Sequence, residues 1–268
     1  MSTRLPPHPV NIERFDDEQA LSAALATRVL ASIAAQPALV LGLPTGRTPL
    51  LLYRELRERS SGRPAGSGPS RSTSTDGGRI DWSGVRTFNL DEFVGLADGH
   101  PGSYRAFMQA ELFDHVSIKP ENIGMLNGRA PDLHAECRRY EDAIRAVGGI
   151  DLQILGIGAN GHIGFNEPAD GLCAHTHVAE LEQRTREANA QWFGDDWRAV
   201  PERALSMGMA TILSAHHIVM MANSPDKADA VYGMVNGLIT TQLPASFLQV
   251  HPRVTVMLDR DASRRLTL

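Results

Sequence analysis

The sequence has little cysteine and no long hydrophobic run. Its 268 residues include only two cysteines, Cys137 and Cys173, which form no CxxC pair and no metal-ligand spacing. A disulfide framework and a cysteine metal site are therefore not expected, and a reducing cytoplasm is the predicted location. No run of about 18 apolar residues occurs, so a membrane span is not expected either. The polar, proline-rich segment 1–11 lacks the apolar region of a secretion signal.

The sequence also lacks an excess of positive charge. It carries 26 basic and 31 acidic residues, a formal net charge of -5, so nucleic acid is not an expected partner. An anionic ligand would have to be held by local charges, because the overall field does not attract it. The length suits one α/β domain with a sizeable core, and we expect residues 1–268 to form a single domain. Whether that domain is a monomer or a homo-oligomer stays open.

Short apolar runs alternate with helical patterns along the chain, which is typical of a parallel sheet covered by helices. The apolar runs are 38–43, 85–90, 150–157, 217–222 and 254–258, and the helical stretches are 17–35, 50–59, 132–147 and 226–235. The runs are rich in Val, Ile and Leu without clean alternation, as in strands buried on both faces. We therefore predict an α/β fold with a doubly wound, mostly parallel, Rossmann-like sheet and helices on both faces.

Residues 60–78 depart from this pattern. The segment is built of Ser, Gly, Thr, Pro and Arg, with almost no apolar residue. Such a composition cannot offset its ordering entropy by burial, which predicts a flexible surface loop. The segment interrupts an otherwise continuous alternation, so we interpret it as an insertion within one domain. A linker between two domains is the alternative.

Polar clusters follow four of the predicted strands, and ligands of open α/β sheets bind beyond the carboxyl ends of the strands. The first cluster is Thr45, Gly46, Arg47 and Thr48. Gly46 lets the backbone approach an anion, the threonines offer hydroxyl groups, and a helix begins at about residue 49, where free N–H groups favour phosphate. This pattern predicts a phosphate cradle. A plain turn with Thr48 as helix N-cap is the alternative.

Two acids, Asp91 and Glu92, directly follow the second apolar run. Neighbouring side chains at a strand end point in different directions, so the two residues need not share a site. Burial can raise the pKa of a carboxyl group toward neutrality, and an acid at the mouth of a sheet can then act as a general base. A helix or turn cap is the alternative interpretation.

The third cluster is a glycine loop around His162. Its spacing, Gly156-x-Gly158-x-x-Gly161, matches the dinucleotide fingerprint. A glycine and a proline soon afterwards interrupt the helix that should receive the pyrophosphate, so a nicotinamide cofactor is not expected. The loop instead presents His162, with Glu167 near enough in sequence to orient it, and a His–carboxylate pair is a common proton shuttle. A histidine satisfied within the core is the alternative.

The fourth cluster contains Lys227, at the predicted start of helix 226–235. A lysine is mildly disfavoured there by the helix dipole, and this conflict indicates a ligand anion. A solvated surface lysine is the alternative. The other histidines have no metal-ligand spacing, so no metal site is predicted.

Six segments together resemble the glucosamine-6-phosphate deaminases, within the wider group that includes the 6-phosphogluconolactonases. The resemblance spans about residues 39–259 and rests on LGLPTGRTPLLLYREL, TFNLDEFVGL, HPGSYRAFM, ECRRYEDAI, LGIGANGHIGFNEP and LPASFLQVHP. GHIGFNEP with FNLDE is specific to the deaminases, because the lactonases lack the Phe-Asn-Glu-Pro continuation. The resemblance implies a hydrolytic, isomerising deamination of glucosamine 6-phosphate to fructose 6-phosphate and ammonia, in N-acetylglucosamine catabolism and without a cofactor.

The resemblance also implies roles for individual residues. His162, oriented by Asn160 and Glu167, would open the pyranose ring, and Asp91 would then move a proton from C2 to C1. The substrate phosphate would be bound by Lys227 and the cradle, that is, by Thr45, Gly46, Arg47 and Thr48.

Three departures from the family pattern bear on these roles. Position 160 is Asn, where some relatives carry Asp. Arg47 replaces a small residue of the phosphate loop, and Gln191 stands where relatives often have a phosphate-binding Arg. Segment 174–180 lacks the Lys and Arg with which regulated members bind N-acetylglucosamine 6-phosphate. A 6-phosphogluconolactonase and a non-catalytic sugar-phosphate sensor are the alternative functions, and the preference between glucosamine and galactosamine phosphate stays open.

Overall fold

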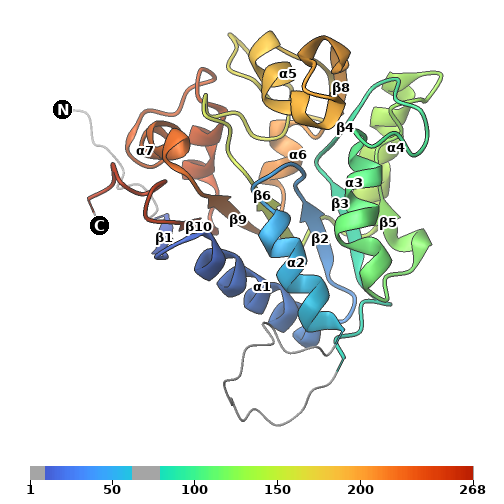
Figure 1. Ribbon diagram of the computed structural model, residues 1–268, viewed down its shortest axis with the longest axis horizontal. Coiled ribbons are helices and arrows are strands. Elements are labelled where there is room, and N and C mark those ends of the chain that lie inside the picture. The colour runs from blue at the N-terminus through green and yellow to red at the C-terminus, as the bar shows by residue number, and fades with distance from the viewer. Residues whose placement is uncertain (1–9, 62–78, 268) are drawn as a thin grey trace.

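The computed structural model describes residues 10–61 and 79–267, so most of the predicted insertion at 60–78 lies outside the described residues. Figure 1 shows a central sheet covered by helices. Seven parallel strands form it in the spatial order β1-β10-β9-β6-β2-β3-β5. Their bounds are β1 Asn11–Arg14, β2 Val40–Leu43, β3 Arg86–Asn89, β5 Ile123–Gly124, β6 Leu152–Leu155, β9 His217–Ala222 and β10 Val254–Leu258. The predicted fold class is confirmed.

The described helices include four at the predicted places, α1 Glu18–Ala35, α2 Leu50–Ser60, α4 Leu133–Ala146 and α7 Ala228–Asn236, and also α3 Tyr104–Glu111, α5 Gln183–Asn189 and α6 Met209–Leu213. Asp17 and Asp132 cap α1 and α4, because each side chain accepts the backbone N–H of the third residue after it. α7 begins two residues later than predicted, because Pro225–Lys227 form a 3-10 turn, η5. None of the described helices is both long and apolar enough to cross a membrane.

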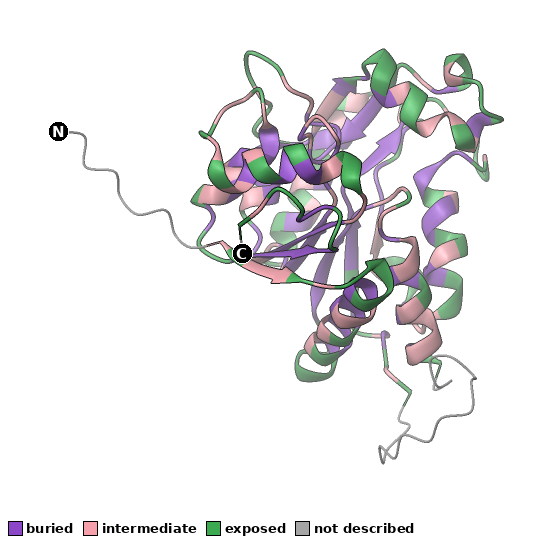
Figure 2. Cartoon of the chain, turned by 60° about the vertical axis from the view of Figure 1, so that its left-hand side comes forward, coloured by how far each residue is buried: buried purple, intermediate pink, exposed green. Residues whose placement is uncertain are grey.

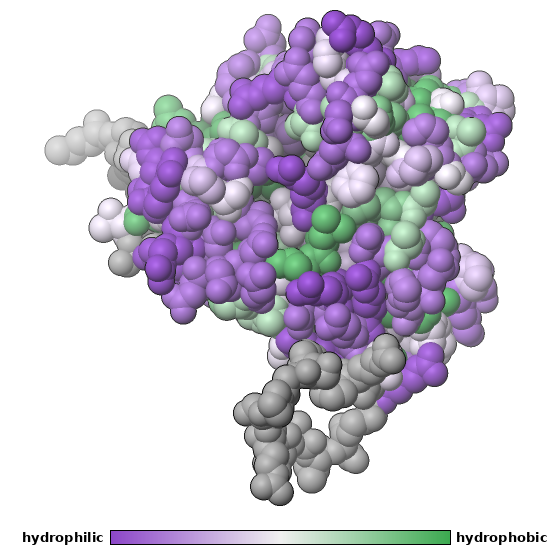
Figure 3. Space-filling view, viewed as in Figure 1, coloured by the Kyte–Doolittle hydropathy of each residue, from purple (hydrophilic) through white to green (hydrophobic). Residues whose placement is uncertain are grey.

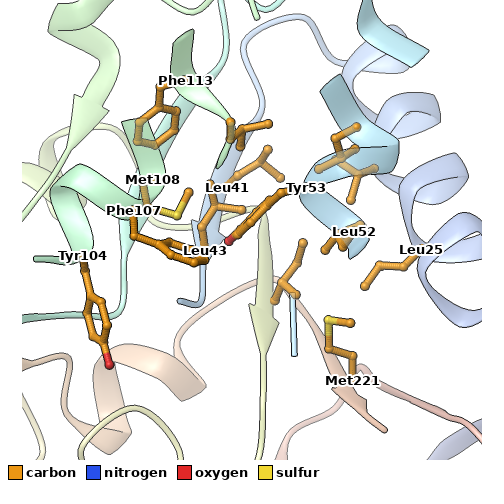
Figure 4. Close-up of a cluster of buried hydrophobic side chains, with 14 of the residues drawn as sticks. Leu25, Leu41, Leu43, Leu52, Tyr53, Tyr104, Phe107, Met108, Phe113 and Met221 are labelled. Carbon is orange, nitrogen blue, oxygen red and sulfur yellow. The ribbon is translucent and has the colours of Figure 1, made fainter. Parts of the chain in front are cut away.

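The central sheet separates two hydrophobic cores, one on each face. On β2, Leu41 and Leu43 lie in the core that α1, α2 and α3 cover, whereas Val40 lies in the core under α4, α6 and α7. This division follows the two-residue period of a strand. Figure 2 shows most of the central strands as buried and the outer faces of the helices as exposed. In the first core Tyr53 meets Phe107 edge-on, with ring centroids 6.2 Å apart, beside the leucines of β2 (Figure 4).

A second sheet, which is antiparallel, carries Asp91, one of the polar residues of the sequence clusters. Its order is β4-β8-β7, with β4 Asp91–Phe93, β7 His177–Glu180 and β8 Arg203–Ser206. β4 begins at Asp91, directly after the loop residue Leu90. Asp91 lies opposite Ser206 of β8 in the antiparallel pair. Asp91 is therefore held by regular strand pairing rather than by a free loop. The apolar pattern does not predict this sheet.

Residues 183–199, which we call the α5 segment, lie beyond the carboxyl ends of the central strands. The segment contains α5 and two 3-10 turns, η3 Ala190–Phe193 and η4 Trp197–Ala199. Figure 1 shows α5 at the top of the molecule, above β2 and β6. On the face of the molecule that Figures 1 and 3 share, hydrophilic residues cover most of the surface and hydrophobic residues gather near its centre (Figure 3).

Candidate active site

One cavity, with a volume of about 770 Å³, lies beyond the carboxyl ends of β2, β3, β6 and β9, where ligands of open α/β sheets bind. All four polar clusters of the sequence contribute to its wall. The residues of the predicted site in this wall are Thr45, Gly46, Arg47, Thr48, Asp91, Asn160, His162 and Lys227. Glu167 is not part of the wall and contacts His162. The fold thus brings together residues that are up to 182 positions apart in sequence.

Asp91 faces the cavity although only 6% of the residue is exposed. Its Oδ1 atom accepts a hydrogen bond from the hydroxyl of Thr45 at 3.2 Å. Burial raises the pKa of Asp91 to about 7; the hydrogen bond from Thr45 opposes this rise, and the charge of Glu92 adds to it. A carboxyl group with such a pKa is divided between its acid and base forms near neutral pH, as a proton-transfer group requires.

Glu92 does not share the site with its neighbour. Its carboxylate accepts the backbone N–H groups of Tyr104 and Arg105 at 2.9 and 2.8 Å. These are the first two residues of α3, whose N–H groups have no partner within the helix. The alternative considered for this pair of acids is therefore correct for Glu92, which caps a helix, and wrong for Asp91, which faces the cavity.

His162 and Glu167 form part of one polar network. The buried Nδ1 atom of His162 lies 3.3 Å from Oε2 of Glu167. The same Oε2 atom accepts a hydrogen bond from the Asn160 amide at 2.7 Å, and Oδ1 of Asn160 accepts the backbone N–H of His162 at 3.2 Å. The hydroxyl of Thr185, in α5, donates to Oε1 of Glu167. Because Nδ1 is turned to Glu167, Nε2 is the ring nitrogen left for a ligand.

The network keeps Glu167 ionised. Burial acts to raise its pKa, but the hydrogen bond and charge of His162, together with hydrogen bonds from Thr185 and Asn160, lower the pKa to about 2. A permanent carboxylate can orient the imidazole and stabilise its protonated form. The side chain of His162 is 27% exposed and lines the cavity, so the interpretation as a satisfied core histidine is wrong.

The glycine loop makes room for this histidine. A Cβ atom on Gly158 would collide with the ring of His162, and one on Gly161, which has a φ of 84°, would collide with Leu243. No helix begins at residues 161–168, as the interrupted pattern predicts; the described backbone there has an isolated bridge between Ile163 and Asn166. The glycine spacing therefore serves close packing around His162.

The cradle residues form the turn between β2 and α2. The Tyr53 hydroxyl donates to the carbonyl of Pro44, which ties the turn to α2. Gly46 has a φ of 87°, a value that favours glycine. The residue before the first helical position is Pro49, and no side chain caps the helix. The alternative in which Thr48 is the N-cap is therefore wrong, and its hydroxyl stays available at the cavity wall.

Lys227 lies at the end of η5, where the chain enters α7. Its Nζ atom pairs with the carboxylate of Asp226 at 3.0 Å, and 21% of its side chain is exposed. The lysine is thus a partly buried wall residue, and the alternative of a solvated surface lysine is wrong. Gln191 also lies in the wall, so a neutral side chain stands where the resemblance places an arginine.

Several wall residues carry no signal in the sequence. The hydroxyl of Tyr104 donates to Oδ1 of Asn189 at 3.2 Å, which ties α3 to α5. Arg184 also lies in the wall. Polar residues of a charged helix look like a solvated surface, and only the tertiary fold brings α5 over the cavity. In the part of the chain that the structure describes, no group of three His, Cys, Asp or Glu residues is arranged to hold a metal ion.

Known proteins resemble this chain over nearly its whole length. The family model described as glucosamine-6-phosphate isomerases/6-phosphogluconolactonase matches residues 16–257. Glucosamine-6-phosphate deaminase 2 of Bacillus subtilis (strain 168) is 45% identical over 255 residues, which cover 95% of each protein. The glucosamine-6-phosphate deaminase of Thermoanaerobacter pseudethanolicus is 44% identical over 243 residues, or 91% of this chain and 90% of the relative.

Solved structures show the same relationship. A monomeric glucosamine-6-phosphate deaminase matches with a TM-score of 0.85 and 38% identity, over 95% of this chain and 99% of the other. The 6-phosphogluconolactonase from Trypanosoma cruzi matches with a TM-score of 0.74 over 99% and 100% of the two chains, but its 16% identity supports the shared fold alone. The chain therefore belongs to the family of glucosamine-6-phosphate isomerases and 6-phosphogluconolactonases.

Proposed function

We propose that this protein is a glucosamine-6-phosphate deaminase, which converts glucosamine 6-phosphate and water to fructose 6-phosphate and ammonia in amino-sugar catabolism. The observation that carries the proposal is the meeting of a buried carboxyl group, Asp91, and a histidine–carboxylate pair, His162 and Glu167, at one cavity. Relatives 44–45% identical over most of the chain bear this name. The lactonase alternative has the support of the shared fold only.

The first step assigned to the site is the opening of the pyranose ring. His162 moves a proton between the C1 hydroxyl and the ring oxygen, which leaves an aldehyde at C1. Glu167, ionised at neutral pH, stabilises the imidazolium form during this transfer. Asn160 fixes the geometry, because it binds both the carboxylate of Glu167 and the backbone N–H of His162.

Asp91 then carries out the isomerisation. Its carboxylate takes the proton from C2 of the open-chain sugar. The electron pair of that C–H bond forms a C1–C2 double bond while the π pair of the C1 carbonyl moves onto the carbonyl oxygen, which takes up a proton from solvent. The protonated Asp91 returns the proton to C1, which leaves an iminium group at C2. A pKa of about 7 suits both directions of this transfer.

Water completes the reaction. It adds to C2 of the iminium group, and the resulting carbinolamine expels ammonia to leave the ketone of fructose 6-phosphate. One C–N bond is hydrolysed for each sugar isomerised, so the reaction consumes one water molecule. Proton transfers, the addition of water and the loss of ammonia account for every step, and no cofactor enters the scheme.

The 6-phosphate is assigned to the cradle and Lys227 in the same wall. The threonine hydroxyls, the backbone at Gly46 and the side chains of Arg47 and Lys227 would bind it; the threonines are Thr45 and Thr48. Charge-assisted hydrogen bonds from a guanidinium and an ammonium group are the interactions that phosphate oxygens favour.

Ammonia release from a panel of amino-sugar phosphates tests the proposal. Purified protein should produce ammonia and fructose 6-phosphate in equal amounts from glucosamine 6-phosphate, and the same assay with galactosamine 6-phosphate should settle the epimer preference. The Asp91→Asn variant, purified in the same way, controls for contaminating enzymes. Release of ammonia from no member of the panel would contradict the proposal, and hydrolysis of 6-phosphogluconolactone in its place would establish the alternative.

A further inference from the structure

Two of the three cations in the cavity wall have no anionic partner among the residues that the structure describes. Its cationic residues are Arg47, Arg184 and Lys227. Lys227 pairs with Asp226. Within residues 10–61 and 79–267, neither arginine has a carboxylate oxygen within 4.0 Å. A guanidinium in this situation is available to an anionic ligand.

Arg184 stands next to acids and polar groups that could have engaged it. Glu187 follows it by three residues, a spacing at which opposite charges commonly pair on a helix. The Oε1 atom of Glu187 accepts a hydrogen bond from Gln183 instead, at 2.7 Å. The neighbouring Arg186 has partners, because it donates to the carbonyl groups of Val200 and Arg198 and lies 3.6 Å from a carboxylate oxygen of Glu202. Of these two arginines of α5, only Arg184 lies in the cavity wall.

The backbone that carries Arg184 is fixed relative to the reacting groups. The next residue, Thr185, is buried and donates to Glu167, the partner of His162. At the other end of α5, Asn189 accepts the hydroxyl of Tyr104. Arg184 is therefore an exposed side chain on a backbone held at both ends, which limits the ordering entropy that binding a ligand would cost.

The three cations approach the cavity from different elements. In the sheet order, β6 lies between β9 and β2, so Lys227 and Arg47 stand on either side of the glycine loop that follows β6. Arg184 belongs to the α5 segment, which lies above these strands (Figure 1). A phosphate dianion in a partly buried cavity needs compensating charge, and part of the charge of Lys227 is already neutralised by Asp226.

We propose that Arg184 is a specificity-determining residue that binds the phosphate group of the substrate from the α5 side. The inference rests on the proposed function for the identity of the substrate, but the anion-binding role is tested separately with inorganic phosphate. In this arrangement the phosphate links the α5 segment to the turns after β2 and β9, and sugars without a phosphate lose that link.

The experiment compares Arg184→Gln with Arg138→Gln, which removes the same charge from an exposed position of α4. KM and kcat are measured with glucosamine 6-phosphate, and the dissociation constant of inorganic phosphate is measured by calorimetry. Because Arg184→Gln removes one charge-assisted contact, we expect it to raise both KM and the dissociation constant of inorganic phosphate about 10- to 150-fold. Its kcat should stay near that of the control variant. Arg184→Lys should recover part of the loss, because it keeps the charge without the bidentate geometry.

The outcomes separate this inference from the proposed function. If Arg184→Gln and Arg138→Gln had the same KM and the same dissociation constant for inorganic phosphate, Arg184 would not bind the phosphate group. A loss confined to kcat would also contradict this role. If the wild-type protein releases no ammonia, the proposed function fails, while the phosphate constants still decide whether Arg184 binds the anion. Even then, a larger dissociation constant for inorganic phosphate in Arg184→Gln, but not in Arg138→Gln, would support the inference.

Discussion

At the scale of single residues, the burial of Asp91 is expected to control the rate of the reaction. Asp91→Asn removes the base but keeps the shape of the side chain, so turnover should fall about 10²- to 10⁴-fold with little change in substrate binding. In the wild-type enzyme only the ionised form can take the C2 proton. Because the pKa is raised to about 7, kcat/KM should decline as the pH falls below about 7. A pH–rate profile measures this; near-wild-type ammonia release by the Asn variant would show that Asp91 is not the base.

The same burial predicts a gain in stability for Asp91→Asn above neutral pH. A carboxyl group whose pKa is higher in the folded than in the unfolded protein stabilises the fold below about pH 4, and this contribution is lost as the pH rises through about 7. A rise in pKa from 3.8 to about 7 corresponds to at most about 4 kcal/mol. The variant should therefore melt at a higher temperature than wild type at pH 8, and the difference should shrink toward pH 5.

Thermal unfolding across this pH range provides the measurement. Asp170→Asn is the matched control, because it makes the same substitution at an exposed position. If Asp91→Asn were no more stable than wild type at pH 8, the carboxyl group would not be titrating in a buried environment, and its assignment as a base tuned by burial would lose its physical reason.

His162 is expected to act before Asp91 in the reaction. Its ring is fixed by Glu167 at Nδ1, so Nε2 serves the ring-opening proton transfer. His162→Gln should therefore reduce turnover of the cyclic substrate about 10²- to 10⁴-fold and affect an open-chain amino-sugar phosphate far less. Steady-state rates on the two kinds of substrate make the comparison. Equal losses on both would place His162 in the later steps.

At the scale of secondary-structure elements, the sequence predicts the strands that are continuous apolar runs. It does not predict the strands that form only because distant segments pair in the folded protein. β2 and β9 are recognisable because both faces of the sheet are covered, which makes their runs apolar throughout. β5 has only two residues, and β4 begins with two acids, so neither resembles a buried strand. β4 becomes a strand because β8, more than 100 residues later, pairs with it.

The same division applies to the site. Asp91 and His162 are predictable because catalytic groups of α/β proteins follow strand ends, where the chemistry of the residue and its place in the fold agree. Arg184 and Thr185 belong to the polar helix α5, and nothing in their own sequence distinguishes them from solvated residues. Their place in the site depends on contacts with Glu167 and Tyr104 that only the folded chain makes.

A prediction that joins two elements concerns Arg47, after β2, and Gln191, after α5. Both lie in the cavity wall, and we expect Arg47 to bind the phosphate from the side of the turn, in place of an arginine at position 191. One charge-assisted interaction contributes about 1.5–3 kcal/mol, so Arg47→Gly should raise KM about 10- to 150-fold. Adding Gln191→Arg to this variant should recover much of the loss. An unchanged KM in Arg47→Gly, or a double variant no better than the single one, would contradict this placement.

At the scale of the whole molecule, the charge distribution bears on regulation. The net charge is -5, so a second anion would need a local basic site. Segment 174–180 is where the resemblance places the basic residues of regulated relatives. In this chain the carboxylate of Glu141 accepts the backbone N–H and the hydroxyl of Thr176, and it also accepts the hydroxyl of Thr211 in α6. Burial acts to raise the pKa of Glu141, but these hydrogen bonds lower it overall. The group that contacts Thr176 of this segment is therefore a carboxylate and not a cation.

N-acetylglucosamine 6-phosphate is therefore expected not to activate this enzyme. Anions avoid a site whose fixed charge is negative, and the imidazole of His175 already lies 3.9 Å from the carboxylate of Glu141. Ammonia release should follow hyperbolic kinetics against glucosamine 6-phosphate, and the half-saturating concentration should not change when the effector is added. The variant Glu141→Gln removes the repelling charge and serves as the comparison. Sigmoidal kinetics in the wild-type enzyme that become hyperbolic with the effector would show that an activating site exists elsewhere in the molecule.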